Sequence, residues 1–118
     1  MVLGNKSEHQ KAFDIICKHM LEQNERSVSK VSGACRYRGQ SGMMCAIGVL
    51  IDDEHYYPEI EGKSACETVV RQSLRSSGWE LDDSFLVALQ DIHDLAAPEK
   101  WKERLSDVGR GFRLKVDE

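Results

Sequence analysis

Charged and aromatic side chains that could recognise a ligand gather between residues 36 and 61. Arg36 and Arg38 would share one face of an extended segment, and paired arginines can clamp a carboxylate or phosphate through parallel N–H donors. The candidate binding residues are Arg36, Tyr37, Arg38, Asp52, Asp53, Tyr56, Tyr57, Glu59 and Glu61. The structural alternative, which the sequence favours, is that the arginines pair with the acidic residues and hold the loop of residues 52–61 in place.

His93 could support acid–base chemistry, because a histidine oriented by a carboxylate is a common general base. The candidate catalytic set of a small hydrolase or transferase is therefore His93 with Asp94 or Glu61. A histidine this close to an apolar helix stripe is more often hydrogen-bonded in the core, and Asp91 and Asp94 are expected on different sides of the helix. The common phosphate-binding, dinucleotide-binding, metalloprotease and serine-hydrolase motifs are absent from the sequence, so we favour a function without catalysis.

The cysteines are spaced unlike a metal-binding or redox motif. Cys17, Cys35, Cys45 and Cys66 contain no CxxC pair, and in a reducing compartment they are expected to be free thiols that behave as small apolar side chains. Cys35 and Cys45 are the best alternative zinc ligands, but zinc would need further ligands gathered one by one. We therefore expect neither a metal nor another cofactor.

Composition restricts the partners. With 118 residues, 41% hydrophobic and 31% charged, the chain suits one globular domain. A net charge of −4 disfavours a nucleic-acid surface, which needs excess positive charge. No apolar run approaches the roughly 20 residues of a membrane span, and the N-terminus does not resemble a secretion signal, so the expected location is the cytoplasm. A homo-oligomer stays open.

Four helices are expected to position these residues. Apolar side chains recur at helical spacing in residues 7–24, 64–78, 82–95 and 97–108. Capping boxes at Ser7 and Ser64 would begin the first two helices, and Asn24 and Gly78 would end them. Fraying is expected after Val108. The predicted single domain covers residues 1–118, with residues 1–6 and 115–118 frayed.

Between the first two helices, the sequence predicts one small β-hairpin. Residues 35–38 alternate like a strand, residues 39–42 contain two glycines, and Met43 and Met44 could pair back. Residues 45–51 form the most apolar run and are core as helix or as strand; we favour a short helix, in which Gly48 lets a neighbouring backbone approach closely. The predicted fold class is α-rich (α+β), with four main helices and this hairpin.

The central stretch resembles a group of small hypothetical proteins encoded by phages, prophages and bacterial genomes. The matching residues are Cys35, Tyr37, Arg38, Gly39, Gly42, Cys45, Ala46, Gly48, Leu50, Ile51, Asp53, Tyr56, Glu61 and Gly62, followed by Leu89, Gln90, His93, Asp94 and Trp101. Val49 and residues 25–33 depart from the pattern. The resemblance implies a phage-type accessory role and no particular chemistry.

The sequence therefore predicts a non-enzymatic binding module, a phage-type accessory or counter-defence protein that binds a host protein or a small anionic ligand. The alternatives are a small enzyme that uses His93 with a nearby carboxylate, and a zinc-stabilised interaction domain.

Overall fold

The computed structural model describes residues 6–29 and 35–116 and contains the four predicted helices. They are α1 (Lys6–Gln23), α2 (Thr68–Ser76), α3 (Asp83–Leu95) and α4 (Trp101–Gly111). Five short 3₁₀ turns join them: η1 (Gln40–Gly42), η2 (Gly48–Leu50), η3 (Asp53–His55), η4 (Pro58–Ile60) and η5 (Pro98–Lys100). No helix in the described part of the chain is both long enough and apolar enough to cross a membrane.

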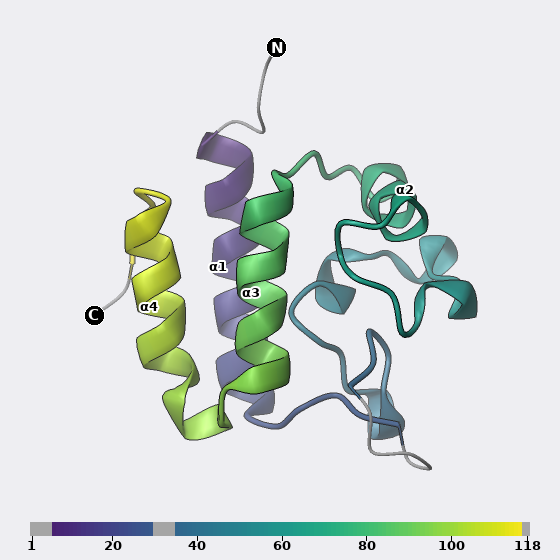
Figure 1. Cartoon of the computed structure of the whole chain (residues 1–118), viewed down its shortest axis with the longest axis horizontal. Coiled ribbons are helices and arrows are strands. Elements are labelled where there is room, and N and C mark those ends of the chain that lie inside the picture. The colour runs from purple at the N-terminus through teal and green to yellow at the C-terminus, as the bar shows by residue number, and fades with distance from the viewer. Residues whose placement is uncertain (1–5, 30–34, 117–118) are drawn as a thin grey trace.

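The helices divide the molecule into two parts, which Figure 1 shows side by side. Helices α1, α3 and α4 stand together as a bundle, while α2 and the turns of residues 40–60 lie beside it, with η2 against α1 and with η3 and η4 against α2. The largest fully buried side chains come from both parts: Ile16 and Met20 of α1, Ile47, Ile60, Val70 of α2, Phe85, Leu86, Leu89 and His93 of α3, and Trp101 and Leu105 of α4. One core therefore joins the bundle to the turns.

The apolar run of residues 45–51 lies in this core, as expected. It forms the single turn η2 rather than a strand, so the preference for a short helix is confirmed. Gly48 packs directly against the backbone of Tyr37, and a side chain at position 48 would collide with the Tyr37 carbonyl. The helix does not continue through residues 52–56, because Asp52 is extended and η3 starts afresh after it.

The predicted β-hairpin is wrong. Residues 35–44 contain only isolated antiparallel bridges, between Val28 and Cys35 and between Arg38 and Met44. The two arms are joined by bonds from the Gly39 N–H to the Met43 carbonyl and from the Cys45 N–H to the Tyr37 carbonyl. The ladder goes no further because the Tyr37 N–H, which would complete the pair with Cys45, donates to the Glu61 carboxylate instead. The glycine turn is present as η1, with Ser41 and Gly42 at positive φ.

The C-terminal ends of α1 and α2 lie where the sequence predicts them, next to an asparagine and a glycine. Asn24 has a φ of 53° directly after α1, and Gly78 has a φ of 94° after α2. Helix α2 begins at Thr68 rather than near Ser64, and α4 continues past Val108 to Gly111. Lys115 exchanges two hydrogen bonds with Gln10 of α1. The frayed ends predicted for residues 1–5 and 117–118 lie outside the described residues.

We expect the Gly48→Ala variant to be destabilised by about 1–3 kcal/mol, because the added methyl group must displace the Tyr37 backbone. The measurement is the free energy of unfolding from urea denaturation. The matched control is Gly111→Ala, where the methyl group meets open space at the end of α4 and should stabilise the protein by up to about 1 kcal/mol. Equal effects at the two positions would contradict the close approach at Gly48.

Candidate functional site

The carboxylate of Glu61 organises the predicted binding residues. It accepts the backbone N–H groups of Tyr37 at 2.8 Å and Arg38 at 3.0 Å, and the hydroxyl of Tyr56 at 2.7 Å. We call these contacts the Glu61 clamp. Burial and the hydrogen bond to Glu61 together raise the pKa of Tyr56. The clamp holds residues 37–38 against the turn of residues 56–61, which is a structural use of a predicted ligand-binding residue.

The guanidinium group of Arg38 is also hydrogen-bonded within the protein. Its guanidinium donates to the Asp53 carboxylate and to the Ile51 carbonyl, both at 2.6 Å, and its centre lies 4.9 Å from the Tyr56 ring centroid. Arg36 is held more loosely, with its Nε 3.7 Å from Glu61. The arginines therefore pair with the acidic loop, as the structural alternative predicted. A strong anion clamp would need both guanidinium groups to be free.

Three predicted residues take no part in the Glu61 clamp or in the contacts of Arg36 and Arg38. Asp52 and Glu59 are exposed, and Tyr57 exposes 54% of its surface. Tyr57 and Glu59 instead line an open depression of about 630 Å³ between η4 and α2, completed by Ile60, Val69, Gln72, Ser73, Arg75 and Ser76. We call this depression the Tyr57 hollow.

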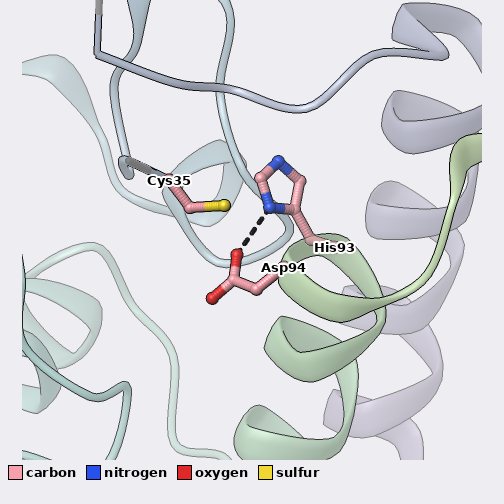
Figure 2. Close-up of side chains that lie close together, drawn as sticks. All are labelled: Cys35, His93 and Asp94. Atoms are coloured by element: carbon pink, nitrogen blue, oxygen red, sulfur yellow. Dashed lines mark hydrogen bonds and ion pairs between the residues drawn. The ribbon is translucent and has the colours of Figure 1, made fainter. Parts of the chain in front are cut away.

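His93 is sealed in the core and both of its ring nitrogens are occupied. Nε2 faces the backbone N–H of Ser27 at 2.9 Å, so it must be the acceptor, and Nδ1 must therefore carry the proton that it donates to Asp94 at 2.8 Å. Figure 2 shows the bond to Asp94. The ring also stacks on Trp101 at 5.6 Å. A general base must reach its substrate with a free nitrogen, which this geometry does not offer.

Cys35 completes a group that resembles a thiol–imidazole–carboxylate triad in composition only. Its sulfur, a ring nitrogen of His93 and a carboxylate oxygen of Asp94 all lie within 4.8 Å of one another (Figure 2). In a working triad one imidazole nitrogen accepts the thiol proton while a carboxylate holds the other. Here Asp94 and the Ser27 amide take both nitrogens, and burial and the Asp94 carboxylate raise the pKa of Cys35, which disfavours a thiolate.

The same contacts disfavour zinc. A metal on Nδ1 of His93 would force the ring proton onto Nε2, where it would face the Ser27 N–H group. Cys45, the other predicted ligand, is fully buried, and burial raises the pKa of its thiol to about 12. Its sulfur accepts the backbone N–H of Gly48. The contacts of the two thiols therefore give no support to the alternative of a zinc site that pairs Cys35 with Cys45.

Beside Cys35 the structure contains a second depression, which we call the α3 cleft. It has a volume of about 340 Å³ and lies between residues 35–37, residues 62–65 and one side of α3. Asp91 and Asp94 both line it, so the prediction that they point to different sides of the helix is wrong; residues three apart are neighbours on a helix surface. Lys63, also on its wall, was not singled out from the sequence.

The residues that position His93 were missed as well. Ser27 supplies the amide described above, and Arg26 donates to the carbonyls of His93 and Ala96 at the end of α3. The sequence of residues 25–33 reads as a mobile serine-rich loop, but its described part is tied to α3; residues 30–34 lie outside the described residues. The one sequence signal for these contacts is that an arginine can bond the last carbonyls of a helix. It could have been used only if Arg26 were already known to lie near the end of α3.

We expect the Glu61→Gln variant to lose about 1–3 kcal/mol of stability, since the amide offers one acceptor oxygen where the carboxylate uses two. The measurement is urea denaturation. Glu59→Gln, two residues away and exposed, is the matched control and should change stability by less than about 0.5 kcal/mol. A Glu61 variant as stable as the control would show that the clamp contributes nothing.

Alkylation with iodoacetamide at about pH 8 should modify the thiols in a fixed order, since only the thiolate reacts. We expect Cys66, which is exposed, to react before Cys35, and Cys45 to react only on unfolding. The Asp94→Asn variant should speed alkylation of Cys35 several-fold, because removing the carboxylate lowers the pKa of Cys35. Peptide mapping by mass spectrometry measures each rate. Asp91→Asn, in the same cleft, is the control; acceleration there instead would contradict the assignment.

Searches against protein-family models, curated proteins and solved structures found no match to this chain. The resemblance to small phage-encoded proteins therefore stays a prediction that rests on the residues quoted for it. The Tyr57 hollow and the α3 cleft are the two surfaces from which a function can be argued.

Proposed function

We propose that this protein is a non-enzymatic binding module of the phage accessory type, which acts in the cytoplasm by binding a host protein through the Tyr57 hollow. The observation that carries the proposal is the exposure of two apolar side chains around one depression: Tyr57 at 54% and Val69 of α2 at 38%. Exposed aromatic side chains beside a depression are typical of the central contacts of protein interfaces.

The floor and frame of the Tyr57 hollow are fixed before any partner arrives. Ile60 is almost fully buried beneath it, and the Glu61 clamp holds the next residue. Tyr57 is therefore presented on an ordered turn, η4, rather than on a loose loop. A preorganised surface loses little conformational entropy on binding, which favours affinity.

One acidic side chain, the exposed Glu59, lines the Tyr57 hollow. Asp52, Asp53 and Glu54 are exposed in the residues that precede it, and Asp53 is paired with Arg38. On the opposite wall Arg75 is paired with Glu80 at 3.4 Å. The complementary partner is a protein that presents an apolar side chain flanked by lysine or arginine.

The alternatives receive less support from the same contacts. A small anion would need Arg38, which is already bound to Asp53 and Ile51. An enzyme that uses His93 would need a free ring nitrogen, and a zinc site built on Cys35, His93 and Asp94 would need the same atom. The partner-binding proposal uses none of these groups.

The test is selection of random peptides, displayed on phage, against the purified protein. We expect enrichment of sequences with an aromatic or large aliphatic residue between basic residues. Fluorescence polarisation of an enriched peptide should show at least about tenfold weaker binding to the Tyr57→Ala and Glu59→Lys variants. The matched control is Leu95→Ala, because Leu95 exposes 77% of its surface but does not line the Tyr57 hollow. Peptides without the basic pattern, or peptides that bind Tyr57→Ala as well as the wild type, would overturn the proposal.

A further inference from the structure

The α3 cleft carries charges of both signs that the protein does not pair with each other. Lys63 and Asp91 line it, and neither makes an ion pair with any residue in the described ranges. Arg36 and Asp94 also line it. The α3 cleft is therefore balanced in charge, with two cationic and two anionic side chains on its walls.

On the anionic wall of the α3 cleft, hydrogen bonds hold the Asp94 carboxylate in a fixed orientation. One oxygen of Asp94 accepts hydrogen bonds from His93 and from Gln90, both at 2.8 Å. The second oxygen is directed away from the imidazole (Figure 2). His93 is in turn held by the Ser27 amide, so the orientation of Asp94 is set by a buried chain of contacts. Asp91 adds a second carboxylate one helical turn earlier on the same cleft.

The cationic wall comes from the segments that the Glu61 clamp fixes. Arg36 directly precedes the clamped Tyr37, and its Nε is buried without a hydrogen-bond partner. Lys63 follows Glu61 by two residues, and its carbonyl accepts the Tyr37 hydroxyl at 2.7 Å, which ties its backbone to the same segment. Both cations therefore belong to one braced wall that faces α3 across the cleft.

We infer that the α3 cleft binds a small zwitterion, that is, a free amino acid or a related compound with one ammonium and one carboxylate group. The ammonium group would be received by Asp91 and Asp94, and the carboxylate by Arg36 and Lys63. A volume of about 340 Å³ is at the lower end for small-molecule sites, which fits a ligand of amino-acid size. Val87, Ala65 and Cys35 leave room for a small apolar side chain between the two walls.

This site is separate from the one proposed for a protein partner. The α3 cleft and the Tyr57 hollow share no lining residue. Loss of peptide binding at the Tyr57 hollow would therefore leave the α3 cleft untested, and loss of amino-acid binding at the α3 cleft would leave the Tyr57 hollow untouched.

The test is a titration of the ¹⁵N-labelled full chain with glycine, alanine, serine and cysteine at up to about 10 mM, where a Kd of about 1 mM gives near-complete occupancy. Each amino acid is compared with its amide, which lacks the carboxylate, and with its N-acetyl derivative, which lacks the ammonium group. We expect amide resonances of residues 35–37, 62–65 and 87–94 to shift with at least one free amino acid, and its two derivatives to bind at least about tenfold more weakly.

The variants Asp91→Asn and Lys63→Gln should each weaken that binding at least about tenfold, since each removes one charge from the wall without disturbing the core. The matched controls are Glu99→Gln and Lys100→Gln, which change exposed charges at the start of α4. No shift with any of the four amino acids would overturn the inference. Equal binding of a free amino acid and either derivative, or unchanged binding to both cleft variants, would also overturn it.

Discussion

The half of the molecule without long helices depends on one carboxylate that accepts two consecutive backbone amides. The N–H groups of residues 37 and 38 do not bond the returning segment of residues 43–45, and unpaired amides in a half-buried segment are costly. Glu61 supplies both acceptors and also binds the Tyr56 hydroxyl. The segments before and after the apolar run are thereby joined, with Tyr57 on one side of the junction and Arg36 on the other. Both candidate surfaces depend on this junction.

His93 has the corresponding role where the loop after α1 meets the helical bundle. A buried imidazole whose two nitrogens were unsatisfied would destabilise the core. Ser27 and Asp94 satisfy both nitrogens, and the ring packs flat on Trp101. The same contacts prevent His93 from acting as a base and leave the nearby thiol without an imidazole nitrogen to accept its proton. The group of Cys35, His93 and Asp94 has the composition of a catalytic triad, but its contacts serve to orient the Asp94 carboxylate towards the α3 cleft.

The two surfaces differ in their charges and therefore suit different partners. The Tyr57 hollow is open and bordered by exposed apolar side chains, and its Arg75 is paired with Glu80, so that the Glu59 carboxylate suits a large partner with a basic rim. The α3 cleft is smaller and balances two cations against two anions, which suits a small molecule that carries both charges. The net charge of −4 describes neither surface, because it averages over them.

Local physics in the sequence determined the four helices, the positive φ at Asn24 and Gly78 and the buried run of residues 45–51. Each follows from a period of a few residues or from the conformational freedom of one residue. Even the shared face of Asp91 and Asp94 was available from their spacing. Only the tertiary structure decided that the Glu61 carboxylate accepts amides 23 and 24 residues away, and that an amide 66 residues away donates to the His93 ring. A backbone donor in a loop can be satisfied by any acceptor of suitable geometry, and which acceptor arrives is fixed by packing, not by sequence spacing.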